Sequence, residues 1–347
     1  MGRLDSAPPG PYNGLAVRTE RELIERIRAR IPSRAGSSRA VDLRIGIGDD
    51  ATVLRPRRGS EWVLTCDACL ENVHFLAPVH PPRAVGYKAL ARATSDIAAM
   101  GAVPRLFLLS LALPRNRTGD WLDGFITGLA RAARKFGLVL AGGDTSRHPT
   151  VVVSITVLGE VTPGRAVTRS GARPGDLLYV TGRLGEAQLG LELVLRGLYR
   201  QRRWRPLMRP HFSPELRLGL GQWLSRRRLA SAMIDTSDGL STDLGHLCRS
   251  SRVGARVWAE RLPAVRVPPA LQRQGFNALE LALHGGEDYQ LLFTVPRRLR
   301  KAIPSSLRDV PITLIGEITR GRALVLVGSD GRAAPLAARG WDHFRSK

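Results

Sequence analysis

The sequence has few cysteines and no long apolar run. Its three cysteines, Cys66, Cys69 and Cys248, cannot form a disulfide framework, which is typical of a protein from a reducing compartment. The most apolar stretch, 106–114, is far shorter than the roughly 20 residues that span a bilayer. Residues 1–20 also lack the apolar core of a signal peptide. We therefore expect a cytoplasmic protein with no membrane partner.

Acidic residues are scarce. The 347 residues include 53 Lys and Arg but only 30 Asp and Glu, which gives a net charge of +23. A basic excess of this size is typical of some nucleic-acid-binding proteins. Here, however, the arginines are spread along the chain, and no zinc-finger, RNP or KH signature accompanies them. We therefore expect nucleic acid not to be a partner, and a basic surface that helps to attract anionic nucleotides.

The common nucleotide-binding motifs are also absent. The chain contains no GxxxxGK[ST] sequence and no protein-kinase catalytic loop followed by DFG. The pair Gly46 and Gly48 lacks the later glycine of a dinucleotide-binding fingerprint. Any nucleotide chemistry in this chain must therefore use another set of residues.

Length and apolar content predict two domains, because 43% of the 347 residues are apolar. Alternating strand and helix patterns favour α/β or α+β packing. A Gly-, Pro- and Arg-rich stretch over 162–176 predicts a linker. We expect a flexible extension over 1–18, an N-terminal domain over 19–165 and a C-terminal α/β domain over 166–347. Helices are expected over 19–31, 84–100, 121–136, 185–198, 216–225 and 238–250, and strands over 61–65, 106–113, 150–159, 177–181 and 289–295.

The remaining acids concentrate in junctions rich in Gly, Ser and Thr. Mg²⁺ prefers oxygen ligands such as carboxylates, and adjacent acids such as Asp49 and Asp50 repel each other unless a cation lies between them. A single Asp at such a junction is more often a turn residue or a helix cap, so that alternative stays open for each one alone. The junctions are 46–51, 65–67, 94–101, 141–145, 235–239 and 285–288.

Two of these acids are difficult to explain as caps. Asp96 lies in an apolar helical stretch, where an unpaired charge is costly. Asp235 follows three apolar residues and stands three positions before Asp238, at a transition from strand to helix. Carboxylates brought together from several strand ends are typical of metal-assisted phosphoryl transfer.

The motifs together resemble the thiamine-monophosphate kinase family. They occur in the family's order between about residue 20 and residue 346, and several are long. The matching segments are 46–51, 65–67 with 73–75, 87–90 with 95–102, 142–145, 168–176, 234–235 through 244–246, 285–291 and 340–344.

The resemblance implies a fold and a reaction. The fold is that of the aminoimidazole-ribonucleotide-synthetase-like superfamily, with two domains, and the N-terminal domains of two subunits pair in a homodimer. The reaction transfers the γ-phosphate of ATP directly to thiamine monophosphate with the help of several Mg²⁺ ions. The C-terminal domain is expected to close over the substrate.

The resemblance also implies roles for single residues, which we group by ligand. The implied catalytic carboxylates, which also bind Mg²⁺, are Asp50, Asp96, Asp144 and Asp235. Other positions implied to line the metals are Thr65, Cys66, Asp67 and Asp238. Contacts to ATP are implied for Gly143, Asp144, Arg169 and Ser237, and contacts to the acceptor for His74, Glu287 and Trp341.

The sequence departs from the family pattern at three places. Cys66 stands where the family has Thr or Ser, and a thiol is a soft ligand that suits Mg²⁺ poorly. Asn72 replaces a usual glycine before Val73 and His74. The extension over 1–18 has no recognised counterpart.

Two alternatives remain open at this point. A sister activity of the superfamily would be ATP-dependent amidine ring closure or selenophosphate synthesis, although the latter expects a reactive Cys with a Lys in a Gly-rich N-terminal loop, which is absent here. The other alternative is a basic RNA- or nucleotide-binding protein without catalysis, whose affinity for RNA would depend steeply on salt.

Overall fold

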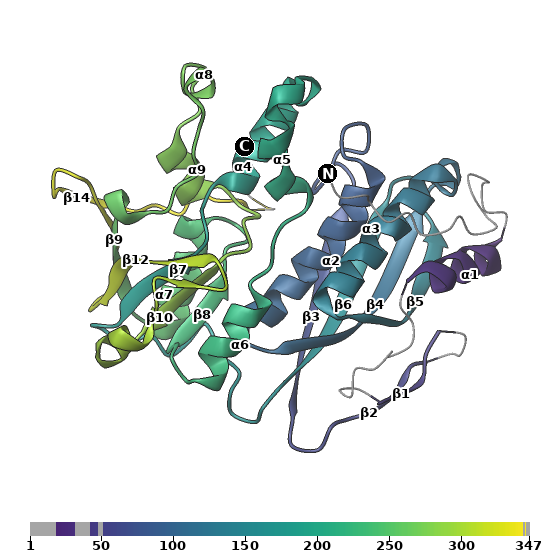
Figure 1. Cartoon of the computed structure of the whole chain (residues 1–347), viewed down its shortest axis with the longest axis horizontal. Coiled ribbons are helices and arrows are strands. Elements are labelled where there is room, and N and C mark those ends of the chain that lie inside the picture. Colours follow the sequence, from purple (N-terminus) through teal and green to yellow (C-terminus); the bar gives the residue numbers. More distant parts are fainter. Residues whose placement is uncertain (1–18, 32–41, 48–50, 343, 345–347) are drawn as a thin grey trace. The chain divides into compact units, whose positions relative to one another are not determined.

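The computed structural model describes residues 19–31, 42–47, 51–342 and 344 (Figure 1). The predicted extension over 1–18 and the Asp49–Asp50 pair lie outside these described residues. No helix within the described ranges is long and apolar enough to cross a membrane.

The chain forms two compact units. The first comprises residues up to 57 together with 66–90 and 105–157, and the second comprises 58–65, 91–104 and 158–347. Strand β3 (Glu61–Leu70) and helix α2 (Pro82–Ala99) therefore contribute residues to both units. The predicted linker over 162–176 lies within the second unit, and the predicted domain boundary at 165 stays a prediction.

A four-stranded sheet in the order β3-β6-β4-β5 forms the centre of the first unit. Strands β4 and β5 run parallel, with Ser110 opposite Asp144. A separate antiparallel pair joins the short strands β1 and β2. The bounds are β1 Asp42–Ile45, β2 Val53–Arg55, β4 Val103–Leu113, β5 Val139–Arg147 and β6 Val152–Val161.

Helix α3 (Asp120–Phe136) packs against the start of α2 through glycines. A Cβ on Gly128 would lie 1.9 Å from the carbonyl oxygen of Arg83, so only glycine permits this approach. Helix α3 has acidic residues in its first turn and basic residues in its last, as the helix dipole favours. It ends at Gly137, whose φ of 71° is left-handed.

Helix α1 (Glu20–Arg30) is anchored by one buried arginine. Arg26 is 2% exposed, its Nε lies 3.0 Å from Oδ1 of Asp123, and its Nη1 donates to the carbonyl oxygen of Thr118 at 2.9 Å. Thr19 caps the helix by accepting from the Glu22 amide, as the Thr-x-x-Glu pattern predicts. The helix is thereby fixed against α3.

The second unit is built on an eight-stranded sheet. Its order is β14-β13-β9-β12-β7-β10-β8, and β11 pairs with β12. All pairs are antiparallel except β13 with β9. The bounds are β7 Leu177–Thr181, β8 Ala232–Asp235, β9 Gly254–Trp258, β10 Leu291–Val295, β11 Ser306–Leu307, β12 Val310–Thr319, β13 Leu324–Val327 and β14 Ala333–Pro335.

Helices cover both faces of this sheet. Leu244 and Leu247 of α7 belong to one apolar core, whereas Leu220 and Leu224 of α6 belong to another that includes the end of α2. The bounds are α4 Glu186–Leu195, α5 Arg205–Phe212, α6 Leu218–Arg226, α7 Leu240–Ser251, α8 Pro269–Gln272 and α9 Ala278–His284, with 3₁₀ turns at Arg115–Arg117, Leu198–Arg200, Arg202–Trp204, Ala259–Arg261 and Arg297–Ala302.

The predicted helices and strands are confirmed, with three differences in detail. Strand β3 does not end at Thr65 but continues to Leu70, so Asp67 lies inside a strand rather than at a junction. Likewise, Gly143 and Asp144 lie within β5. Strand β10 begins at Leu291 rather than at Tyr289, because Tyr289 has a left-handed φ of 49°. In β3 and β5, residues that disfavour strands concealed the strand, whereas Tyr289 favours strands but has a backbone conformation that excludes it from one.

Candidate active site

Two short hydrogen bonds organise the carboxylates of the second unit. Thr65 Oγ1 donates to Oδ2 of Asp96 at 2.5 Å, and Ser95 Oγ donates to Oδ2 of Asp235 at 2.5 Å. Ser95 and Asp96 belong to the last turns of α2, and Asp235 is the final residue of β8. The predicted residues Thr65, Asp96 and Asp235 are thereby brought together.

The carboxylate of Asp235 lies in an unfavourable setting for a negative charge. The residue is 3% exposed. Burial and the nearby Asp96 carboxylate raise the pKa of Asp235 to about 7, although the Ser95 hydrogen bond and the charge of Arg169 act in the opposite direction. A buried carboxylate that is repelled by a second, partly buried one would be stabilised by a cation.

The loop after β8 is fastened to two other segments. The Glu287 amide donates to the carbonyl oxygen of Ser237 at 2.8 Å, and the Trp341 amide donates to that of Asp238 at 3.0 Å. The side chain of Trp341 is 43% exposed. The predicted residues Ser237 and Asp238 therefore lie beside Glu287 and Trp341, which are distant from them in the sequence.

Asp243 supports the same loop from the first turns of α7. Its Oδ2 accepts from the amides of Asp238 and Gly239 at 3.2 and 3.0 Å. Burial and the charges of Asp235 and Asp238 raise the pKa of Asp243 well above its ordinary value. Sequence analysis did not single out this residue, because one Asp in a helical segment carries no spacing signal.

Glu287 and Asp288 are adjacent acids that bind different helices. Oε1 of Glu287 lies 3.2 Å from Nη1 of Arg92 in α2, and Oε2 lies 3.2 Å from Nδ1 of His211 in α5. Asp288 instead accepts from the amides of Gly185 and Ala187, at the start of α4. Burial raises the pKa of Asp288 to about 7, although these amides lower it.

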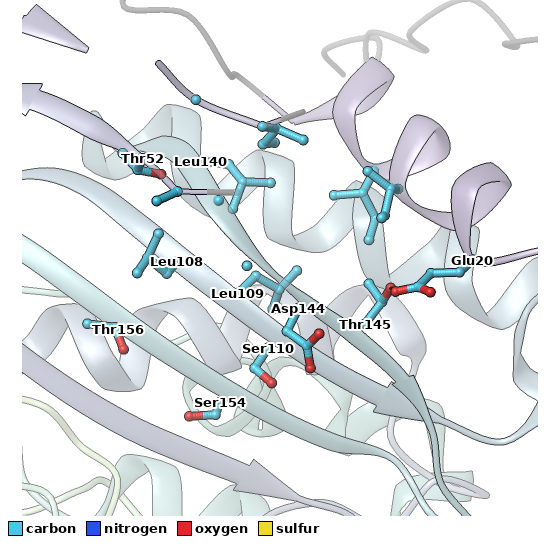
Figure 2. Close-up of a pocket in the computed structure, with 17 residues that line it drawn as sticks. Glu20, Thr52, Leu108, Leu109, Ser110, Leu140, Asp144, Thr145, Ser154 and Thr156 are labelled. Atoms are coloured by element: carbon cyan, nitrogen blue, oxygen red, sulfur yellow. The ribbon is translucent and has the colours of Figure 1, made fainter. Parts of the chain in front are cut away.

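The first unit contains a pocket with a volume of about 930 Å³ (Figure 2). Its lining includes apolar side chains such as those of Ile24 and Ile27 of α1. Figure 2 shows the carboxylate of Asp144 beside Ser110. The polar residues of the lining are Glu20, Thr52, Ser110, Asp144, Thr145, Ser154 and Thr156.

Gly143 allows the backbone of β5 to lie very close to β4 at this pocket. A Cβ on Gly143 would lie 1.9 Å from the carbonyl oxygen of Leu109. Gly143 is itself exposed and lines the pocket, so its peptide groups are accessible to a ligand.

Cys66 lies apart from Thr65 and Asp67. Successive side chains of a strand point to opposite faces, and Cys66 in β3 is exposed while its two neighbours are partly buried. The thiol sulfur of Cys66 lies 3.5 Å from Oγ of Ser154. The side chain of Cys66 therefore does not share a face with that of Thr65.

The other predicted residues of the site have the following positions. Nδ1 of His74 accepts from the Leu70 amide at 3.0 Å in the first unit. Arg169 is exposed in the second unit, and its carbonyl oxygen accepts from Oγ of Ser251 at 3.0 Å. Asp50 lies outside the described residues.

Comparison with known proteins identifies the family. Residues 48–161 match the family described as AIR synthase related protein, N-terminal domain, and residues 173–329 match the corresponding C-terminal domain. The thiamine-monophosphate kinase of Escherichia coli (strain K12) is 39% identical over 322 residues, which are 91% of this chain and 96% of that protein. This chain belongs to the thiamine-monophosphate kinase family. The resemblance inferred from the motifs and the two-domain fold class are thus confirmed.

Solved structures of the thiamine-monophosphate kinase family agree. The enzyme from Stenotrophomonas maltophilia K279a aligns with a TM-score of 0.77 and 36% identity, covering 93% of this chain and 100% of that one. The structure described as AaThiL complexed with AMPPCP and TMP aligns with a TM-score of 0.74 and 33% identity, over 84% of this chain and 89% of that one. The hydrogenase maturation protein HypE shares the fold at 20% identity and a TM-score of 0.73, so the fold alone does not select the reaction.

The donor atoms fit the Mg²⁺ that the thiamine-monophosphate kinase family implies. Thr65, Asp96 and Asp235 supply hydroxyl and carboxylate oxygens, which are the hard ligands that Mg²⁺ prefers. Within the described ranges, no three His, Cys, Asp or Glu side chains converge on a single point. Of the remaining predicted ligands, Asp67 and Asp144 belong to the first unit.

Proposed function

We propose that this chain is a thiamine-monophosphate kinase that transfers the γ-phosphate of ATP to the phosphate of thiamine monophosphate. The observation that carries the proposal is the Asp96–Asp235 pair: the two carboxylates repel each other, Asp235 is buried, and Thr65 and Ser95 bind them. Phosphoryl transfer between anions requires such a site for positive charge. The 39% identity to the kinase of Escherichia coli and the AMPPCP and TMP bound in AaThiL support the same substrates.

We infer that ATP binds in the pocket of the first unit. A volume of about 930 Å³ is ample for a nucleotide, and the apolar side chains of Ile24 and Ile27 suit a purine ring. Asp144 and the backbone around Gly143 also line this pocket, and they are proposed to serve the phosphates. Arg169 and Ser237 are proposed as further contacts to ATP.

Asp96 and Asp235 would hold Mg²⁺, with Thr65 beside them, and Asp238 would contribute from the following loop. Asp67 and Asp144 are proposed as ligands from the first unit, and Asp50 is proposed from the sequence. When bound, the metal neutralises the charge of the phosphates, so that an anionic acceptor can approach ATP.

The acceptor requires no strong base from the protein. The second pKa of a phosphate monoester is about 6, so an acceptor oxygen is already ionised near neutral pH. This oxygen forms a bond to the γ-phosphorus while the bond from that phosphorus to the bridging oxygen of ADP breaks. The side chains of His74, Glu287 and Trp341 are proposed to orient the acceptor, so that positioning supplies most of the catalysis.

We also propose a cytoplasmic homodimer formed through the first unit, whose residues largely fall in the predicted N-terminal domain. Large apolar side chains are exposed on this unit, and exposed apolar patches are typical of interfaces. They are Ile24, Ile45, Val53, Val73 and Leu108, each at least 36% exposed. Light scattering should give the mass of two chains, and the mass of one chain would refute the dimer.

The decisive experiment combines the protein with ATP, Mg²⁺ and thiamine monophosphate, and measures ADP and thiamine diphosphate together. Equal amounts of both products are expected. Asp96→Asn and Asp235→Asn should each lower kcat by about 100-fold or more without unfolding the protein, because the amide removes the charge and keeps the shape. Free phosphate without thiamine diphosphate would instead indicate a sister activity, and full activity of either variant would refute the assigned site.

A further inference from the structure

We propose that Arg92 binds the phosphate of the acceptor while its partner Glu287 binds the acceptor's positively charged ring. The ion pair would then select a substrate that is both cationic and phosphorylated. The inference rests on the proposed function, since thiamine monophosphate carries a thiazolium cation and a phosphate in one molecule. Arg92 is not among the residues that the family resemblance singles out.

Arg92 is placed close to the proposed reaction centre by helix geometry. It precedes Asp96 by one turn of α2, and residues four apart lie on one face with Cβ atoms about 5–6 Å apart. Asp96 is the carboxylate bound by Thr65, and Ser95 binds Asp235. A phosphate drawn to these carboxylates through a cation therefore comes within reach of the guanidinium group.

The side chains of Arg92 and Glu287 are partly accessible, and the buried His211 also contacts Glu287. Arg92 and Glu287 have side chains that are 14% and 18% exposed, whereas the His211 side chain is only 1% exposed. Nη1 of Arg92 lies 3.2 Å from Glu287 Oε1 and 3.4 Å from the hydroxyl oxygen of Tyr289. The buried His211 ring holds the second carboxylate oxygen at 3.2 Å, so a ligand meets a pair whose orientation is already fixed.

The backbone of this loop is held in an uncommon conformation. Glu287 and Tyr289 have φ angles of 65° and 49°, in the left-handed region that residues with side chains rarely adopt. Their amides donate to the carbonyl oxygens of Ser237 and Thr236 at 2.8 and 2.9 Å. Strained residues kept in place by surrounding contacts are typical of functional sites. The loop is thus fixed against the segment that follows Asp235.

The charges of the pair complement those of the acceptor. A guanidinium group can donate two parallel hydrogen bonds to a phosphate, and a carboxylate attracts a cationic ring. Unphosphorylated thiamine offers only the cation. Loss of Arg92 should therefore affect the phosphorylated ligand selectively, whereas loss of the Glu287 charge should affect both ligands.

Isothermal titration of the whole protein, saturated with AMPPCP and Mg²⁺, tests this difference. Thiamine monophosphate and thiamine are the two probes. We expect Arg92→Met to weaken binding of thiamine monophosphate about 10- to 100-fold, the usual effect of losing a charged hydrogen bond, and to leave thiamine nearly unchanged. Glu287→Gln should weaken both. In steady-state assays, Arg92→Met should raise KM for thiamine monophosphate but not KM for ATP.

Two further variants make the result interpretable. Arg256→Met removes an exposed pair in the same unit, Arg256 with Glu317 at 3.1 Å, and should change neither affinity. Arg92→Lys retains the charge and should recover part of the binding even if Arg92→Met does not fold. Unchanged binding of thiamine monophosphate by Arg92→Met, or an equal loss for both probes, would overturn the inference. If the unaltered protein forms no thiamine diphosphate, the proposed function itself fails.

Discussion

Gly143 allows close approach of β5 to β4 and also lines the pocket of the first unit. Its missing Cβ would lie 1.9 Å from the Leu109 carbonyl oxygen, which is backbone and cannot rotate away. We predict that Gly143→Ala lowers the free energy of unfolding by about 1–3 kcal/mol and raises KM for ATP, because β5 must move away from β4. Urea denaturation and steady-state kinetics measure the two effects.

Gly142→Ala is the matched control for this prediction. The nearest atom to a Cβ on Gly142 is Oγ1 of Thr52 at 2.9 Å, which belongs to a side chain that can turn. A smaller loss is therefore expected. If the two variants behave alike, close approach of the strands is not what position 143 requires.

Some residues of the site could be predicted from sequence and others could not. Asp96 and Asp235 were predicted because a charge among apolar neighbours needs an explanation, and the structure brings them together. Arg92 was not predicted, because its proposed role depends on its ion pair with Glu287, which is 195 positions away in the sequence. The same holds for Asp243, whose role appears only when the amides of Asp238 and Gly239 are in place.

Arg26 is the buried anchor of helix α1, which forms part of the pocket wall. The guanidinium group is 2% exposed and bound to Asp123, whose side chain is 17% exposed. We predict that Arg26→Met lowers the free energy of unfolding by roughly 2 kcal/mol, because the hydrogen bonds of a buried charged group are lost while Asp123 keeps its pair with Arg30 at 2.6 Å. It should also raise KM for ATP, because the side chains of Ile24 and Ile27 would no longer be held at the pocket. KM for thiamine monophosphate should stay the same.

Arg21→Met is the control for this prediction, because it removes a positive charge from the same helix and leaves the buried anchor in place. Arg21 pairs with Glu25 at 3.0 Å, and its side chain is 89% exposed, so its contribution to stability is small. Thermal unfolding and KM for ATP should match those of the unaltered protein. An equal effect of the two substitutions would argue against the anchor.

At the level of elements, the prediction succeeded where periodicity was strong. Helix α3 was recognised because its apolar positions repeat at helical spacing, and strand β7 because it is a short continuous apolar run. Strand β5 was missed because Gly142, Gly143 and Asp144 are typical of turns. Here the register with β4 overrides local preference, and such pairing between distant segments is not visible in a single sequence.

For the whole molecule, the distribution of motifs was more informative than composition. A net charge of +23 is typical of some nucleic-acid-binding proteins, but the even spread of the arginines led us to expect no nucleic-acid partner and pointed to no particular reaction. The ordered motifs pointed to one family, and the 39% identity over 91% of the chain confirmed it. Composition reports on the surface, whereas motifs report on the site, so only the latter could identify the reaction.

The stability of the molecule should depend on pH in a direction set by Asp288. Its pKa is raised to about 7 in the folded protein from an ordinary 3.8, so the folded state holds the proton more tightly than the unfolded state. Its contribution is therefore complete below about pH 4 and is lost as pH rises through about 7. In Asp288→Asn, the free energy of unfolding in urea should therefore decrease less as the pH rises from about 4 through about 7.

The exposed residue Asp309 provides the control, and Asp309→Asn should leave the pH profile unaltered. Asp235 retains its own dependence in both variants, since burial and Asp96 raise its pKa in the same direction. A profile for Asp288→Asn that coincides with that of the unaltered protein would show that the Asp288 carboxylate does not titrate there.

The adjacent acids Glu287 and Asp288 have separate sets of partners. One acid binds Arg92 and His211, and the next begins helix α4 through Gly185 and Ala187. The partners of Glu287 could be exchanged to accept a different substrate while the helix start remains intact. Deleting Gly286, the residue before them, would shift both acids at once. Substitution at this dipeptide is therefore a route to new specificity, whereas a change in its length is not.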